Sequence, residues 1–209
     1  MSSQTFASDI VFMHRLGVLP VLVHDVAERE PAQRLIGYIN RVGGDAVGID
    51  GLAASTLTLA ATENGAVELR GVNASLLQLL LGQGYIPVVA SQGSAISGVP
   101  MTIDVDETAR ALAGAIGAIR LLFGSQPGGV PSDGDGVIAE LTSSEALALV
   151  SSGGLSTALA HCLTSAALGV RAGVEAAQIL DLSSAHAAIV ELLTAQHLGT
   201  QVVSNIHLA

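Results

Sequence analysis

The chain has 209 residues, of which half are hydrophobic and only 12% are charged, and its formal net charge is −10. All eight of its basic residues are arginines, so chemistry that needs a lysine ammonium group is excluded. Nucleic acids and anionic membranes are not expected as partners, because they bind clustered positive charge. The single cysteine, Cys162, allows no internal disulfide and favours a reducing, cytoplasmic compartment.

The first half of the chain alternates helical and strand patterns. Gly17 ends the first helix, and Asn64-Gly65 between two apolar runs is typical of a hairpin turn. The predicted elements are, in order, a helix over residues 6–16, a strand over 20–24, a helix from Pro31 to Gly43, a strand over 45–49, a hairpin of 57–61 with 66–69, a Leu-rich helix capped by Asn73, and a buried strand over 86–90.

The second half continues this alternation. Thr142 and Glu145 have the spacing of a capping box, which predicts a helix start. The predicted elements are a helix from Asp104 or Asp106 to about Gly117, a strand over 119–123, a helix over 146–150, a longer Ala-rich helix after Gly154, a strand over 177–180, a helix over 184–194 and a strand over 199–203. We therefore predict one α/β domain over residues 1–209, a three-layer αβα sandwich with an open, mainly parallel sheet.

Short sequence motifs do not identify a reaction or a ligand for this chain. The six histidines show no metal-ligand spacing, so no metal site is predicted. No G-x-G-x-x-G, no G-x-x-x-x-G-K-[ST] and no G-x-S-x-G is present. The Gly-rich segment 124–129 follows a predicted strand, where main-chain amides can approach a phosphate. That feature alone does not identify a nucleotide site.

An ordered set of short segments carries a family resemblance. These segments are Leu19-Pro20-Val21-Leu22-Val23-His24, Asp45-Ala46-Val47-Gly48-Ile49-Asp50-Gly51, Gly84-Tyr85-Ile86-Pro87-Val88-Val89, Ile103-Asp104-Val105-Asp106, Leu121-Leu122-Phe123-Gly124-Ser125-Gln126-Pro127-Gly128, Ile138-Ala139-Glu140-Leu141-Thr142, Gly153-Gly154-Leu155 and Gly199-Thr200. From about residue 16 to residue 200, the chain resembles the amino-acid kinase family, and most of all its N-acetylglutamate kinases.

The resemblance implies a fold and an activity. Such kinases transfer the γ-phosphoryl group of ATP, with Mg²⁺, to an amino-acid carboxylate on the path to arginine. Residues 1–100 would form the substrate-side lobe and residues 101–209 the nucleotide-side lobe. The substrate positions are His24, Asp25, Thr102 and Asp104, and the nucleotide positions are Gly48, Gly51, Ser125, Pro127, Gly128 and Gly154. Asp106 matches the aspartate that orients the family's catalytic lysines.

The departures from the family pattern concern the groups that handle phosphate. The first strand of the family fold, with its lysine, is not matched, and Ala158 stands where the second lysine is expected. Asp25-Val26-Ala27 replaces a glycine loop, and the substrate-binding arginine is not matched between His24 and Pro31. Phosphoryl transfer depends on positioning and charge neutralisation, so these losses predict lost or strongly impaired transfer.

Three functions remain open at this point. The chain is a degenerate homologue that acts as a binding or partner subunit, an active kinase whose charge neutralisation comes from arginine or from a partner chain, or a sensor of a small amino-acid ligand. ATP and Mg²⁺ are cofactors only if activity survives. The unmatched first strand predicts an exposed sheet edge, which favours a homo-oligomer or a hetero-oligomer with a related kinase.

Overall fold

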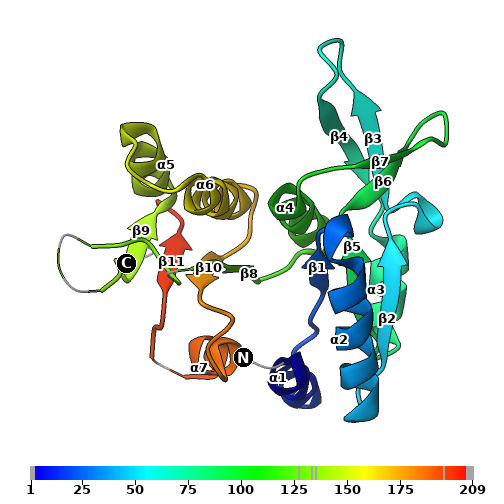
Figure 1. The fold of residues 1–209 in the computed structure, drawn as a ribbon, viewed down its shortest axis with the longest axis horizontal. Helices are drawn as coiled ribbons and strands as arrows, with labels where there is room; N and C mark the ends of the chain where they lie inside the picture. Colours follow the sequence, from blue (N-terminus) through cyan, green and yellow to red (C-terminus); the bar gives the residue numbers. More distant parts are fainter. Residues whose placement is uncertain (1–2, 127, 133, 135, 195, 206–209) are drawn as a thin grey trace. The chain divides into compact units, whose positions relative to one another are not determined.

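The computed structural model describes residues 3–126, 128–132, 134, 136–194 and 196–205 (Figure 1). The chain divides into two compact units, Ser2–Ile116 and Gly117–Ala209, which we call the N-terminal and C-terminal units. No helix in the described ranges is long and apolar enough to cross a membrane.

The N-terminal unit contains helices and two sheets. Its helices are α1 (Ser3–Arg15), η1 (Val26–Glu28), α2 (Arg29–Arg41), η2 (Ala53–Ser55), α3 (Ser75–Gly82) and α4 (Val105–Ile116). Its strands are β1 (Leu22–His24), β2 (Ala46–Asp50), β3 (Leu57–Ala61), β4 (Val67–Val72), β5 (Ile86–Ala90), β6 (Gln92–Ala95) and β7 (Pro100–Thr102).

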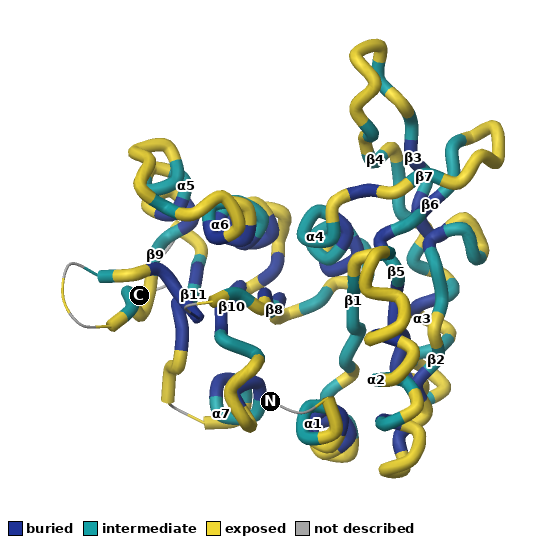
Figure 2. The backbone as a smooth tube through the Cα atoms, viewed as in Figure 1, coloured by how far each residue is buried: buried dark blue, intermediate teal, exposed yellow. Residues whose placement is uncertain are grey.

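The parallel sheet of this unit has the order β1-β5-β2 and is covered on both faces. Val89 of β5 packs with Leu77 of α3 and Leu112 of α4 in one core cluster. On the opposite face Gly48 lies under Ile36 of α2, close enough that an added Cβ would be 2.8 Å from Ile36 Cδ1. This arrangement confirms the predicted αβα layering, and the apolar strand β5, buried from Ile86 to Val89, forms its centre (Figure 2).

The second sheet of the unit has the order β4-β3-β6-β7 and is mixed. The predicted hairpin is confirmed, because β3 and β4 pair antiparallel and Gly65 adopts a left-handed φ of +81° in the turn. The chain passes from the buried strand β5 through Ser91 directly into β6, so the end of the parallel sheet leads into the second sheet.

The C-terminal unit has one sheet with the order β8-β10-β11-β9. The pairs β8–β10 and β9–β11 are parallel, while β10 and β11 are antiparallel. Helix α6 contacts β8, β10 and β11, and α5 contacts β9. The elements are β8 (Arg120–Gly124), β9 (Glu140–Thr142), α5 (Ser143–Ser152), α6 (Thr157–Arg171), β10 (Ala176–Leu180), α7 (Ala187–Leu193) and β11 (Thr200–Val203).

Differences from the predicted elements have local causes. The helix predicted from residue 184 begins at Ala187, because His186 adopts a left-handed φ of 61° that a helix does not accept. Strands β6, β7 and β9 were not predicted, since they are short and partly polar. Asn73 accepts a hydrogen bond from the Ser75 amide at 3.1 Å, so it supports the start of α3 from just outside the helix.

Candidate functional site

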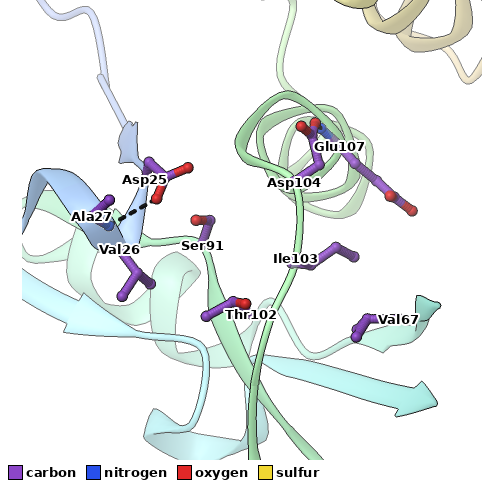
Figure 3. Close-up of a pocket in the computed structure, with 9 residues that line it drawn as sticks. All are labelled: Asp25, Val26, Ala27, Val67, Ser91, Thr102, Ile103, Asp104 and Glu107. Carbon is purple, nitrogen blue, oxygen red and sulfur yellow. Dashed lines mark hydrogen bonds between the residues drawn. The ribbon is translucent and has the colours of Figure 1, made fainter. Parts of the chain in front are cut away.

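A cavity of about 690 Å³ lies within the N-terminal unit, at the carboxyl ends of β1 and β5. This is where open α/β sheets bind their ligands. Its lining comes from four parts of the unit, as Figure 3 shows, and consists of Asp25, Val26, Ala27, Val67, Ser91, Thr102, Ile103, Asp104 and Glu107. Three predicted substrate positions, Asp25, Thr102 and Asp104, thus meet in one cavity.

Both aspartates are held by the helices that they begin. Asp25 Oδ1 accepts a hydrogen bond from the Ala27 amide at 2.8 Å and caps η1. Asp104 Oδ1 accepts from the Glu107 amide at 3.0 Å at the start of α4. A carboxylate at a helix N-terminus is favoured by the unpaired amides there. These caps fix both carboxylates at the edge of the cavity.

Glu107 adds a third acidic group. Its side chain is 36% exposed and lies 3.8 Å from Arg110, one turn further along α4. Figure 3 shows the Glu107 carboxylate turned away from Asp25. Of the nine described residues that line the cavity, none is an arginine or a histidine, so its side-chain charges are negative.

Ser91 and His24 lie where β1 and β5 end. Ser91 is buried, and its amide donates to His24 O at 2.9 Å. His24 Nδ1 lies 2.7 Å from Asp25 O, and His24 is not among the lining residues. The fourth predicted substrate position is therefore next to the cavity and not in its wall.

Two predicted nucleotide positions of this unit have tight packing. Gly48 lies in β2 beneath Ile36. A Cβ at Gly51 would lie 2.2 Å from Gln92 O and 2.6 Å from Leu57 Cβ, so only glycine fits there. Asp106, the predicted orienting aspartate, lies in the first turn of α4, and its side chain is not part of the cavity wall.

The other nucleotide positions lie in the C-terminal unit, where Ser125 and Gly128 contact the end of β10 and the residue after it. The Ser125 amide donates to Leu180 O at 2.8 Å. Gly128 has a φ of +89° and packs against Asp181. Gly154, with a φ of +93°, precedes α6, and a Cβ added there would meet no atom within 4 Å. Pro127 falls outside the described residues.

Asp181 is the acidic group beside this segment. Hydrogen bonds from the Ser183 hydroxyl and the Ser183 amide, with a smaller contribution from the Ser184 hydroxyl, hold the pKa of Asp181 below its ordinary value of 3.8. Gln126 Nε2 donates to Ser183 Oγ at 3.3 Å, so Gln126, Ser183 and Asp181 form one hydrogen-bonded group.

Sequence reasoning missed Ser91, Glu107 and the apolar wall residues Val67 and Ile103. The position of Ser91, directly after a buried parallel strand, was a usable signal. No comparable signal marked Val67, which reaches the cavity through the pairing of β4 in the second sheet.

Comparison with known proteins places the chain among relatives of one family. The acetylglutamate kinase of Erythrobacter litoralis is 29% identical over 96% of this chain and 84% of its own length. That of Helicobacter hepaticus is 28% identical over 95% of this chain and 86% of its own length. The alignment with the first runs over 252 residues, more than the 209 of this chain, so this chain has gaps relative to it.

A solved structure matches the fold closely. N-acetylglutamate synthase from Neisseria gonorrhoeae, complexed with coenzyme A and N-acetyl-glutamate, superimposes with a TM-score of 0.82 and 20% identity, over 98% of this chain and 56% of that one. The profile of the amino acid kinase family matches residues 8–181. With its fold, its ordered motifs and this match in agreement, the chain belongs to the amino acid kinase family.

Proposed function

We propose that this chain is an acetylglutamate-kinase-like protein in which ATP-dependent phosphoryl transfer to a carboxylate is lost or strongly impaired, and that it acts as a binding or partner subunit. One observation carries the proposal: the cavity at the carboxyl ends of β1 and β5 is lined by Asp25, Asp104 and Glu107. An anionic substrate would meet like charges there, in place of the cations that bind carboxylates and phosphates.

The predicted nucleotide positions of the C-terminal unit also support a loss of phosphoryl transfer. A nucleotide polyphosphate at the segment 124–128 would approach Asp181, a carboxylate that its hydrogen bonds keep ionised. With alanine at position 158 and no lysine in the chain, the residues present do not fit a Mg²⁺-bound triphosphate. Loss of a transition-state cation costs roughly 10³-fold or more in rate.

The surviving-kinase alternative depends on arginine. Arg110 is paired with Glu107, and Arg120 with Glu175 at 3.3 Å, both in ordinary surface ion pairs. Each guanidinium group is engaged with a glutamate, so neither arginine offers a free guanidinium group to the cavity. The shared-site version of the alternative predicts that mixing this chain with a lysine-bearing acetylglutamate kinase raises the total rate.

A coupled assay of ADP release with ATP, Mg²⁺ and N-acetylglutamate tests the proposal. We expect no turnover above a reaction without enzyme, while a lysine-bearing acetylglutamate kinase serves as the positive control. Turnover that scales with the concentration of this chain, and that survives further purification, would overturn the proposal.

A further inference from the structure

Ser91 is a buried polar residue whose hydroxyl is not used by the fold. Only 1% of the residue is exposed, and among the described residues no partner donates to or accepts from its hydroxyl. Its backbone is fully engaged, because its amide bonds to His24 O and its carbonyl accepts from the Ile103 amide at 3.1 Å. The hydroxyl lies in the cavity wall and the described part of the fold leaves it without a partner, so a ligand in the cavity can pair with it.

The carboxylates on either side of Ser91 each keep one oxygen available. Asp25 and Asp104 use Oδ1 for their helix caps. In the described part of the chain, no protein group donates to Oδ2 of either residue. Figure 3 shows the Ser91 side chain between Asp25 on one side and Asp104 on the other. This arrangement presents three oxygen acceptors to one part of the cavity.

The remaining wall is apolar. Val26, Val67 and Ile103 contribute apolar side chains to the cavity wall (Figure 3). A volume of about 690 Å³ is in the range of sites for small organic molecules. Glu107 turns away toward Arg110, and among the described residues no three Asp, Glu, His or Cys side chains are grouped to hold a metal ion. Glu107 therefore does not join the two aspartates as the third acidic ligand of a divalent cation.

We infer that this cavity binds a small organic cation, an ammonium or guanidinium group on a short hydrocarbon stem. The charged head would donate hydrogen bonds to Asp25 Oδ2, Asp104 Oδ2 and Ser91 Oγ, and the stem would contact Val26, Val67 and Ile103. The inference rests on the proposed function, because a cavity that selects cations is the reverse of what an N-acetylglutamate site requires. It also gives the proposed binding subunit its ligand class.

Four probes of similar size test the charge preference: pentylamine, butylguanidine, the neutral pentanol and the anionic hexanoate. Titration calorimetry and thermal unfolding of the full chain should show saturable binding and stabilisation by the two cations alone. Equal binding of hexanoate, or no binding of either cation, would overturn the inference.

Variants locate the binding. Asp25→Asn and Asp104→Asn keep the helix caps, because asparagine caps as well as aspartate does, so both variants should fold. Each should weaken cation binding about tenfold or more, since a hydrogen bond to a charged group is lost. Ser91→Ala should weaken it several-fold with an unchanged melting temperature. Glu63→Gln, in the exposed β3–β4 turn, removes the same charge from a residue that does not line the cavity and should bind like the parent chain.

Two outcomes contradict the inference specifically. Cation binding that is insensitive to both aspartate substitutions would make the attraction a general effect of the net charge. A stabilisation that depends on Asp25 but is produced only by Mg²⁺ or Ca²⁺ would make this a metal site. Failure here is distinct from failure of the proposed function: the ADP-release assay reports turnover, and a chain with neither turnover nor cation binding contradicts this inference alone.

Discussion

A methyl group added at Gly51 would collide with the main chain of the same unit. Its Cβ would lie 2.2 Å from Gln92 O and 2.6 Å from Leu57 Cβ, and neither atom is the end of a flexible side chain. The family resemblance assigns Gly51 to nucleotide binding, whereas the packing alone is a sufficient reason for glycine. A packing role for Gly51 predicts that a substitution there lowers the free energy of unfolding, whereas a role in nucleotide binding alone does not.

Gly51→Ala should lower the free energy of unfolding by about 1–3 kcal/mol, the usual cost of overpacking. Urea unfolding followed by circular dichroism measures it. Gly71→Ala is the matched control, because a Cβ there meets no atom within 4 Å. Equal stability of Gly51→Ala and the parent chain would contradict the packing described here.

Asp181 should make the stability depend on pH. Because its folded pKa lies below the ordinary value of 3.8, its contribution is present above that value and is lost as the pH falls through the folded pKa. Asp181→Asn should therefore be less stable than the parent chain at pH 7, with the difference shrinking toward pH 2. Urea midpoints at the two pH values test this, and a difference that does not change with pH would contradict it.

At the scale of elements, α5 is the helix whose start is best defined. Thr142 Oγ1 accepts from the Glu145 amide, and Glu145 Oε2 accepts from the Thr142 amide at 2.8 Å, which completes the predicted capping box. Thr142→Ala should cost about 1 kcal/mol of unfolding free energy. Ser151→Ala, at the exposed end of the same helix, should cost less than half as much, and the reverse order would contradict the role of the cap.

Some helices, strands and site residues could be predicted from the sequence, and others could not. Periodic apolar segments and their caps predicted most helices and strands, including α4, whose start was expected at Asp104 or Asp106 and is capped by Asp104. Strands β6 and β7 lack apolar alternation; β6 pairs with the edge of β3, and β7 in turn pairs with β6. Asp25 and Thr102 could be proposed from resemblance. The position of Ser91 after a buried strand was a signal for the site, but the burial of its hydroxyl depends on contacts distant in sequence and could not be predicted.

At the scale of the whole molecule, the exposed apolar residues of the first helical region suggest self-association. Phe12 is 49% exposed, Leu16 59% and Leu19 56%, and Phe12 and Leu16 are one helical turn apart. We propose that a second copy of the chain covers them. Strand β1, just after these residues, pairs only with β5 among the described strands and so forms an edge of its sheet.

Light scattering coupled to size-exclusion chromatography should therefore give a mass above that of the 21.0 kDa monomer. Leu16→Ser should shift the population toward the monomer. Ile96→Ser, at an 88% exposed position in another part of the N-terminal unit, should not. A parent chain that stays monomeric at every concentration would contradict the proposed association.

We propose that this chain keeps the fold of the kinase family while it lacks the groups that bind phosphate. Titration calorimetry with Mg²⁺ and ATP tests this proposal, with a lysine-bearing acetylglutamate kinase measured in parallel. We predict no saturable heat for this chain up to millimolar nucleotide. Saturable binding of one nucleotide per chain would contradict the account.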